Sequence, residues 1–457
     1  MPLPVSLTDA LDAIFGPGAW STGVAERLAY AYDNSRLNAQ PDAVVFPTEH
    51  AQVEALVRAC REHRVPLTAR GRGSNTTGAS VPVEGGIVAS FERMNRILRI
   101  DPANRLAVVE PGVINADLQR ALLAHGLFWP PDPSSAPWCS IGGNLACNAA
   151  GPRAVKYGTP RENTLGLRAV AGHGEGFRCG TYTSKGATGY DLTRLLIGSE
   201  GTLALITEAT LKLTPRPSAV RTLRATYRDV GAAAQAVARV MGQPVTPCAL
   251  EFLDETALTL AHAYAGDEVP LAGALLMIEV DGEAATLEAA VAAVAAAARG
   301  DGLQELRVAA SAAEAQRLWA ARKALSPAQR TIARDKINED VVVPVSRLPE
   351  LVEGLRRLAA QHEVLIVSFG HAGNGILHVN LLPRDAAERA RAHACLAEVF
   401  ALVIALEGTL SGEHGIGRIK RAFMPLALEP ATLGLMRAVK QAFDPDGILN
   451  PGKLLPA

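Results

Sequence analysis

The sequence predicts an α+β protein with more than one domain. Its 457 residues are too many for one ordinary hydrophobic core, so two or three domains are expected. Apolar residues make up 48% of the chain and charged residues 20%, which is typical of a globular protein. Short strand-like runs alternate with helical patterns in the first half, and a regular strand–helix rhythm follows residue 217. These observations favour a mixed fold of separately packed domains.

The first half opens with DAVVFP (42–47), which predicts a strand, and HAQVEALVRACREH (50–63), whose apolar residues have helical spacing. VPLTARG, GGIVASFERM and RLAVVEPGV predict further strands. NADLQRALLAHG predicts a helix that Gly126 closes. A boundary is expected at LKLTPRPSAV (211–220), where two prolines end a strand.

The second half has a different rhythm. RTLRATY, CALEFLD, GALLMIEVDG and LQELRVA predict strands, and DVGAAAQAVARVMG and EAATLEAAVAAVAAAARG predict the helices between them. This order is close to a split βαβ, or ferredoxin-like, arrangement. VVVPV (341–345) and a helix over 348–363 are expected next. The predicted division is therefore 1–217 with a core at 38–217, then 218–405, then a small helical C-terminal segment over 406–457.

Composition excludes several classes of protein. Lys plus Arg number 45 and Asp plus Glu number 46, so the basic excess of a nucleic-acid-binding surface is absent. The sequence has no run of eighteen apolar residues and no signal-peptide pattern at its start, so a cytoplasmic protein without a transmembrane helix is expected. The cysteines form no CxxC pair and are expected to be reduced thiols without an iron–sulfur cluster; they are Cys60, Cys139, Cys147, Cys179, Cys248 and Cys395.

The first chemical signal is RGRGSNTTG (70–78). It lacks the GKS or GKT of a P-loop and the GxGxxG of the dinucleotide fingerprint. Its three glycines would let the backbone approach a ligand closely, and successive N–H groups can bind an anion such as a pyrophosphate. Arg70 and Arg72 would either add positive charge to such a site or face solvent. By itself the motif favours a surface turn over a ligand site.

Three further stretches accompany it: PPDPSSAPWCSIGGNLACNAAG (130–151), KYGTPRENTLGLRAV (156–170) and GYDLTRLLIGSEGTLALITEATLKL (189–213). In this order the four motifs resemble the FAD-binding domain of the vanillyl-alcohol oxidase superfamily. FGHAGNGILHVN (369–380), SGEHGIG (411–417) and FDPDGILNPGK (443–453) resemble one branch of it. That branch holds D-lactate dehydrogenases, the glycolate oxidase FAD subunit and D-2-hydroxyglutarate dehydrogenases. The resemblance implies a two-part FAD-binding domain, a ferredoxin-like substrate domain and bound FAD.

The resemblance also implies which residues line the cofactor. The pyrophosphate loop, the segments that border the flavin and adenosine, and a C-terminal asparagine map onto Arg70, Gly71, Arg72, Gly73, Ser74, Asn75, Thr76, Gly78, Pro131, Asp132, Ser135, Gly142, Gly143, Asn144, Gly198, Glu200, Gly201, Ile206 and Asn450. Relatives with covalent flavin usually carry a histidine in the first loop. Ser74 and Asn75 stand there in this chain, so the FAD is expected to be non-covalent.

A second site is suggested by two histidines on either side of a glycine-rich turn. His371 and His378 flank AGNG, a hairpin signal, and Asn380 shares a strand face with His378. Imidazoles suit zinc or manganese, and Glu413 would complete a three-ligand site with open positions. Spacing alone leaves a metal site and buried structural histidines as alternatives. The resemblance favours a divalent metal, usually zinc, although many relatives have Asp-Gly-Asn where Asn374-Gly375-Ile376 stands here.

Further residues are candidates for catalysis and substrate binding. His414 is the expected general base, because an ordinary histidine titrates near neutrality; a solvated histidine is the alternative. Arg322 matches the family arginine that holds a substrate carboxylate, although an exposed helix charge is its default interpretation. Lys336 and Asn380 are further candidates for substrate contact, and for Lys336 a solvated charge is the alternative.

The resulting hypothesis is oxidation of a small D-2-hydroxy acid, such as D-lactate, with hydride transfer to flavin N5. Electrons would then pass to a quinone, a cytochrome or an electron-transfer flavoprotein. Peripheral contact with the inner face of a membrane stays open, and a homodimer is the default expectation. An FAD subunit of a glycolate oxidase complex and a D-2-hydroxyglutarate dehydrogenase are the alternative functions.

Overall fold

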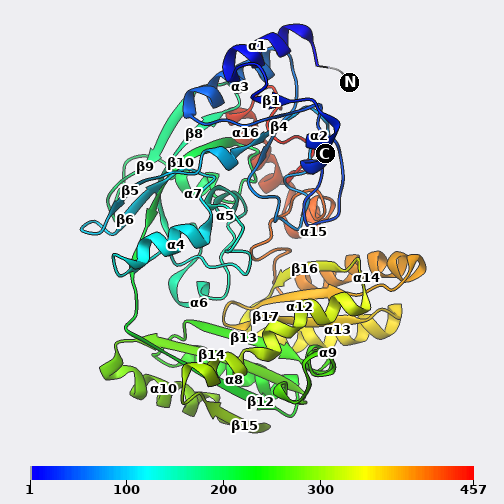
Figure 1. Cartoon of the computed structure of the whole chain (residues 1–457). Helices are drawn as coiled ribbons and strands as arrows, with labels where there is room; N and C mark the ends of the chain where they lie inside the picture. The colour runs from blue at the N-terminus through cyan, green and yellow to red at the C-terminus, as the bar shows by residue number, and fades with distance from the viewer. Residues whose placement is uncertain (1–2, 457) are drawn as a thin grey trace. The chain divides into compact units, whose positions relative to one another are not determined.

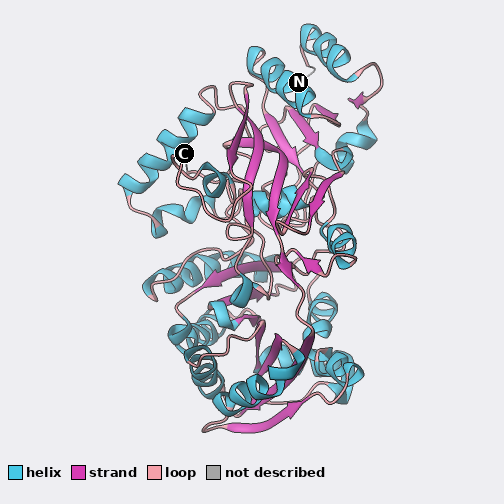
Figure 2. Cartoon of the chain, turned by 90° about the vertical axis from the view of Figure 1, so that its left-hand side faces the viewer, coloured by secondary structure: helices cyan, strands magenta, loops and turns pink. Residues whose placement is uncertain are grey.

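A computed structural model describes residues 3–456, and the chain divides into two compact units. The first unit contains the chain up to Gly151, the segment Gly158–Arg216 and the chain from Glu413 onward. The second unit contains Pro152–Tyr157 and Pro217–Gly412. Figure 1 follows the chain by colour, and Figure 2 shows that strands and helices occur in both units. Each unit has a core of its own.

The first unit begins with a small mixed sheet of β1 (Trp20–Ser21), β2 (Ala43–Val45), β4 (Ile87–Ser90) and β3 (Leu67–Arg70), in that spatial order. β2 and β3 both pair in parallel with β4, and β1 pairs antiparallel with β2. Helices α1 (Val5–Phe15) and α3 (His50–Glu62) contribute Leu7, Leu11, Val53, Leu56 and Val57 to the core of this sheet. The strand expected at 42–47 and the helix expected at 50–63 are therefore confirmed.

A second, antiparallel sheet of the same unit has the order β5 (Ile97–Asp101), β6 (Leu106–Val109), β10 (Ala204–Lys212), β8 (Thr164–Ala171) and β9 (Gly176–Gly180). Its core includes residues of α4 (Asn115–Leu123), α5 (Ile141–Cys147) and α7 (Leu192–Leu196). The short strands β7 (Leu127–Phe128) and β11 (Thr214–Pro215) pair with each other. The remaining helices of the unit are α2 (Val24–Ala29), α15 (Met424–Ala427) and α16 (Pro430–Phe443).

The second unit is built on a seven-stranded antiparallel sheet. The spatial order of its strands is β15 (Leu303–Val308), β12 (Ala219–Tyr227), β14 (Ala274–Gly282), β13 (Ala249–Asp254), β17 (Ile366–His371), β18 (Ile376–Leu381) and β16 (Ile337–Val342). The first four strands have the ferredoxin-like order, with β14 inserted between β12 and β13. The predicted α+β class and ferredoxin-like arrangement are confirmed.

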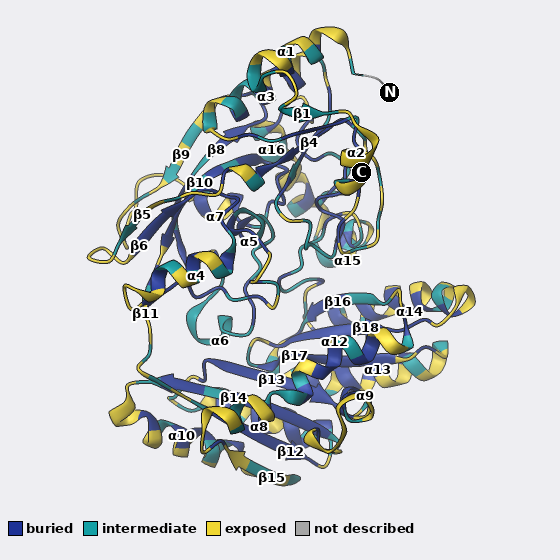
Figure 3. Cartoon of the chain, in the orientation of Figure 1, coloured by how far each residue is buried: buried dark blue, intermediate teal, exposed yellow. Residues whose placement is uncertain are grey.

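Helices cover this sheet. Helices α9 (Glu255–Ala265), α11 (Ala312–Leu318) and α12 (Ala320–Ile332) share a core with Leu253, Met277 and Phe369 of the strands. Helices α8 (Val230–Gly242) and α10 (Ala284–Ala298) lie together against β12 and β14, and α13 (Leu348–His362) packs beside α14 (Ala386–Ala405). Figure 3 shows the central strands buried and the outer surface of α10 exposed.

Two local features differ from the sequence-based expectation. The strand expected at 341–345 lies at Ile337–Val342, because Pro344 has no N–H to donate and begins a short 3₁₀ turn. The second unit also recruits α6 (Ala154–Tyr157) from a distant part of the sequence, and Lys156 and Tyr157 donate hydrogen bonds to Asp281. Within residues 3–456, no helix is long and apolar enough to cross a membrane, and none of the cysteines forms a disulfide.

Candidate active site

The predicted histidine hairpin is present. β17 and β18 are antiparallel neighbours joined by a short turn, and Gly375 in that turn has φ of +73°, a conformation that favours glycine. His378 lies opposite Phe369 in the register, and their rings are 5.5 Å apart. The rings of His371 and His378 approach edge to face with centroids 5.1 Å apart. The hairpin thus brings both imidazoles to one face of the sheet.

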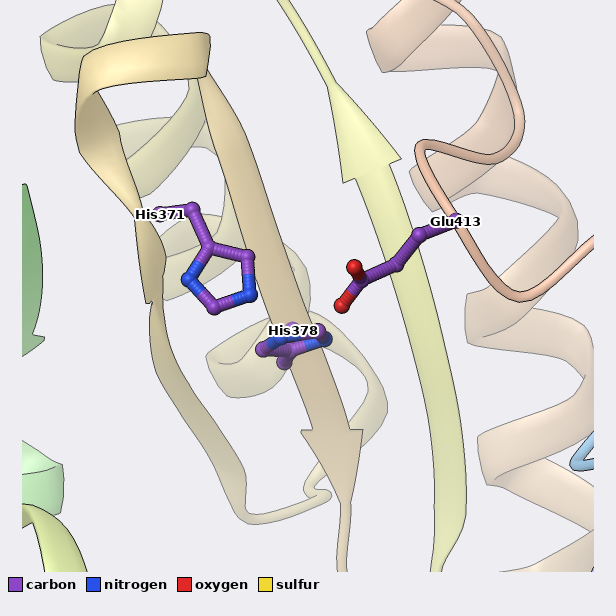
Figure 4. A group of neighbouring side chains, drawn as sticks. All are labelled: His371, His378 and Glu413. Atoms are coloured by element: carbon purple, nitrogen blue, oxygen red, sulfur yellow. The ribbon is translucent and has the colours of Figure 1, made fainter. Parts of the chain in front are cut away.

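Glu413 completes a group that fits a metal ion. One ligand atom from each of His371, His378 and Glu413 lies within 4.8 Å of the other two, and all three residues are buried. Figure 4 shows both rings and the carboxylate directed toward a common point. Two imidazoles and one carboxylate are the donor set of open zinc sites, and the same donors suit manganese. The three residues named from the sequence therefore fit a divalent ion.

Asp340 of β16 holds the two residues that precede Glu413. Asp340 is fully buried and lies opposite His378 in the register of the sheet. Its carboxylate accepts the backbone N–H of Gly412 at 2.9 Å and the hydroxyl of Ser411 at 3.0 Å. Gly412 immediately precedes Glu413 in the chain. In the first unit, Glu413 Oε2 also accepts the backbone N–H of Gly151 at 2.6 Å, so contacts restrain both the main chain before Glu413 and its carboxylate.

A buried carboxylate that the sequence analysis did not name stands beside the hairpin. Glu251 of β13 is the register partner of His371, and its Oε1 is 2.5 Å from His371 Nδ1. Its other oxygen accepts a hydrogen bond from Arg322 Nε at 3.0 Å. Burial alone would raise the pKa of Glu251, but His371 and Arg322 hold that pKa below its ordinary value. Glu251 therefore connects a predicted metal ligand to the predicted carboxylate anchor.

Arg322 is not a freely exposed helix charge. It lies on α12, its side chain is 21% exposed, and its guanidinium carbon is 4.7 Å from the centre of the Phe369 ring. The aromatic contact and the Glu251 hydrogen bond hold the guanidinium on the same sheet face as His371 and His378. The position suits recognition of a small anion beside the histidines.

Lys336 and Asn380 also lie together. Lys336 Nζ donates to Asn380 Oδ1 at 2.9 Å and to Gln329 Oε1 at 2.7 Å. Burial, and next the charges of Arg330 and Arg322, lower the pKa of Lys336 to about 8. Lys336 is thus not the solvated charge of the alternative interpretation, although substrate contact by Lys336 and Asn380 stays a prediction.

Three glycine-rich motifs of the first unit lie beside one another. A Cβ on Gly71 would lie 2.5 Å from Ser140 Oγ, so the loop at 70–78 runs directly beside the start of α5. The N–H groups of Gly198 and Glu200 donate to Leu145 and Ala146 of that helix, each at 2.9 Å. Three motifs that are far apart in the sequence therefore form one surface.

This surface has features that fit a cofactor. Thr76 Oγ1 is buried and has no hydrogen-bond partner among residues 3–456, so the loop offers a hydroxyl to a ligand. Gly73 and Gly78 adopt positive φ values of 64° and 76°, which turn successive N–H groups of the loop. The residues present fit an FAD pyrophosphate. Its contacts with Gly142, Gly143, Gly201, Ser74, Pro131, Asp132, Ser135 and Ile206 remain predictions.

Several predicted cofactor residues have side chains that hold the loops instead. Arg70 is buried, donates to the Tyr32 carbonyl at 2.7 Å and has its guanidinium next to Gly73. Arg72 is half exposed and lies 3.7 Å from Glu92. Asn144 accepts from Asn115 at 3.0 Å. Asn450 donates to the carbonyls of Ala79 and Glu200. Cofactor contact through these four side chains stays a prediction, and their observed partners are protein groups.

Hydrogen bonds to the backbone of the GEHGIG loop hold His414 in place. Asn75 Nδ2 donates to the His414 carbonyl at 3.0 Å. Glu200 accepts the N–H groups of Ile416 and Gly417 at 2.6 and 2.8 Å, so its carboxylate anchors the GEHGIG loop. Burial raises the pKa of Glu200 to about 7. His414 is of intermediate burial, and the Nδ1 atom of its ring is buried.

Comparison with known proteins identifies the family of the chain. Residues 41–180 match the family described as "FAD binding domain", and residues 216–454 match "FAD linked oxidases, C-terminal domain". The glycolate oxidase subunit GlcD of Bacillus subtilis is 40% identical over 98% of this chain and 96% of its own length. The D-lactate dehydrogenase of Anaerostipes hadrus is 34% identical, covering 91% and 90% of the two chains. The D-2-hydroxyglutarate dehydrogenase of Stutzerimonas stutzeri is 33% identical, covering 99% of both.

Solved structures show the same fold. A substrate-bound p-cresol methylhydroxylase superposes with a TM-score of 0.83 at 18% identity, covering 98% of this chain and 96% of that one. A 4-ethylphenol oxidase from Gulosibacter chungangensis superposes with a TM-score of 0.80 at 17% identity, covering 99% and 97%. The two domain matches and the full-length relatives establish that the chain is an enzyme of the FAD-linked oxidase family, and its fold is that of p-cresol methylhydroxylase.

Proposed function

We propose that this enzyme is an FAD-dependent dehydrogenase that oxidises a small D-2-hydroxy acid, D-lactate or a similar acid, to the 2-oxo acid. The observation that carries the proposal is the connection of Arg322 and His371 through Glu251. A 2-hydroxy acid has a carboxylate and a hydroxyl on neighbouring atoms. An anion site and a metal ligand joined by a single carboxylate match that pair of groups.

The residues of the chain have distinct roles in this proposal. Arg322 binds the substrate carboxylate through the guanidinium nitrogens that Glu251 leaves available. His371, His378 and Glu413 would hold a divalent ion, zinc or manganese. Bound FAD would supply the two-electron oxidant, and the ion would supply a Lewis acid that lowers the pKa of the substrate hydroxyl. His414 takes the proton of that hydroxyl. Asn75 and Glu200 hold the loop that carries His414.

The names of the full-length relatives support the substrate class. They act, by name, on glycolate, D-lactate and D-2-hydroxyglutarate, which are all 2-hydroxy acids. The glycolate oxidase relative is named as a subunit, so a flavin subunit of a glycolate-oxidising complex is the second candidate. In either case the reduced flavin would pass its electrons to a partner, such as a quinone, a cytochrome or an electron-transfer flavoprotein.

A substrate screen tests the proposal. Purified FAD-loaded protein is mixed anaerobically with D-lactate, L-lactate, glycolate, D-2-hydroxyglutarate or D-malate, and the flavin absorbance is followed. A small D-acid is expected to bleach the flavin faster than its L-isomer. Dithionite provides the control, because it reduces flavin without help from the site. If dithionite bleaches the flavin and no hydroxy acid does, the single chain is not the proposed dehydrogenase and the complex-subunit candidate is favoured.

A further inference from the structure

Glu251 has an unusual environment for an acidic residue. It lies in the strand ALEFLD, which is buried along its whole length, and is 1% exposed. Burying a carboxylate is unfavourable unless partners compensate for the lost hydration. Its two oxygens have different partners, with Oε1 2.5 Å from His371 Nδ1 and Oε2 3.0 Å from Arg322 Nε. Both partners belong to the proposed site, on strand β17 and helix α12.

The contact with His371 decides which ring nitrogen faces the ligand group. An ionised carboxylate only accepts hydrogen bonds, so His371 Nδ1 must carry the hydrogen. The lone pair of the neutral ring then lies on Nε2, which is the atom left to bind a cation. The register of β13 against β17 places Glu251 directly opposite His371, so the ring orientation is set by the sheet.

The contact with Arg322 decides which edge of the guanidinium meets a ligand. Glu251 occupies Nε, and the aromatic ring of Phe369 supports the guanidinium at 4.7 Å. The pair of terminal nitrogens is the edge that binds a carboxylate through two parallel hydrogen bonds. Without Glu251 the side chain would lose the partner that fixes this edge.

We infer that Glu251 is a positioning residue that organises two sites at once, the metal ligand His371 and the carboxylate anchor Arg322. This inference rests on the proposed function and adds to it a shared support for the two substrate groups. Neither contact requires Glu251 to touch substrate. The signature of the role is that one substitution weakens metal binding and carboxylate binding together, while substitutions of the direct ligands affect mainly one of the two.

The test compares Glu251→Leu with Glu279→Leu. Leucine has no hydrogen-bond acceptor, so at position 251 it removes the partner of His371 and the partner of Arg322 together. Glu279 is a matched control on the neighbouring strand β14. It is partly buried and accepts from Trp319 Nε1 at 2.8 Å and from Thr222 at 3.2 Å. Its hydrogen bonds are to neither His371 nor Arg322.

Two readouts are needed. Zinc affinity of the metal-stripped, FAD-loaded protein is measured by competition with a chromogenic chelator, and KM is measured from anaerobic flavin reduction by the best hydroxy acid. Glu251→Leu is expected to weaken zinc binding about 10- to 100-fold and to raise KM about tenfold or more. Glu279→Leu is expected to change neither by more than about twofold. His378→Ala should also weaken zinc binding. At saturating zinc, its KM should rise less than that of the Glu251 variant.

The outcomes separate the inference from the proposed function. Unchanged zinc affinity in Glu251→Leu, or a change in only one of the two readouts, would overturn the shared role. FAD content and circular dichroism identify a folded variant, and Glu251→Asp, whose shorter side chain draws both oxygens away from His371 and Arg322, replaces the leucine variant if that one does not fold. A wild-type protein that binds zinc but is reduced by no hydroxy acid would refute the proposed function, and the zinc comparison alone would then decide whether Glu251 supports His371.

Discussion

Replacing Arg322 by lysine tests the carboxylate anchor most sharply, because the change keeps the positive charge. Lysine can still pair with Glu251 or offer one hydrogen bond to a substrate carboxylate, but it cannot make the two parallel bonds of a guanidinium. A hydrogen bond to a charged group contributes about 1.5–3 kcal/mol. Loss of one such bond predicts a fall in kcat/KM of about 10- to 150-fold, mostly through KM.

The assay is stopped-flow reduction of the flavin over a range of hydroxy-acid concentrations. The control is Arg317→Lys, an exposed arginine on α11 that has no role in the proposed site. FAD content and zinc affinity should stay close to wild type in both variants, because neither arginine is a ligand of those groups. A KM for Arg322→Lys within twofold of wild type would refute the assignment of Arg322 as the anchor.

Three other predictions concern the remaining site residues. His414→Ala should keep FAD bound and slow flavin reduction by about 10²- to 10⁴-fold in stopped-flow measurements, and an unchanged rate would exclude His414 as the base. His378→Ala should lose bound zinc in elemental analysis while its flavin spectrum stays that of wild type, and retained zinc would show that the ion binds elsewhere. Lys336, whose pKa burial lowers to about 8, loses its positive charge as pH rises through that value. If Lys336 contacts the substrate, KM should therefore rise above pH 8 in wild type and in Lys323→Met, a control at an exposed lysine. Lys336→Met should instead have a high KM that does not change over this pH range. A KM that rises with pH in Lys336→Met as it does in wild type would contradict substrate contact by this lysine.

The sequence predicted the histidine hairpin well because its determinants are local. Alternation along β17 and β18 places His378 and Asn380 on one face, and Gly375 supplies the left-handed residue of the turn. Strand and helix positions in the ferredoxin-like part were predictable for the same reason. The strand predicted at 341–345 lies at Ile337–Val342 instead. Pro344 lacks a backbone N–H and so cannot continue the strand, and the apolar periodicity of the sequence does not show this effect.

The role of Glu251 could not be predicted from local patterns. Its contacts with His371 and Arg322 depend on which strands become neighbours and on their register, and these residues lie 120 and 71 positions away along the chain. One signal was present in the sequence: an acidic residue between two apolar residues, Leu250 and Phe252, inside a strand implies a buried partner. The partner itself became visible only with the tertiary structure.

Local patterns also could not predict the side-chain contacts of the cofactor motifs. Glu200 and Asn450 were assigned to the FAD site, yet the structure shows the Glu200 carboxylate bonded to the loop after His414 and the Asn450 amide bonded to two carbonyls. A motif marks a region of the fold, whereas the direction of each side chain depends on the loops packed around it. Likewise, the recruitment of Pro152–Tyr157 by the second unit leaves no periodic signal in the sequence.

The central claim is that a divalent ion at His371, His378 and Glu413 assists oxidation of a 2-hydroxy acid by bound FAD. The most direct test is anaerobic flavin reduction by D-lactate, or by the best acid of the screen, in native protein, in protein stripped by a chelator, and in stripped protein supplied with zinc or manganese. Metal analysis accompanies each sample. Bleaching that stops on stripping and returns with the ion is the expected result. Bleaching at the full rate in protein shown to be metal-free would contradict the account.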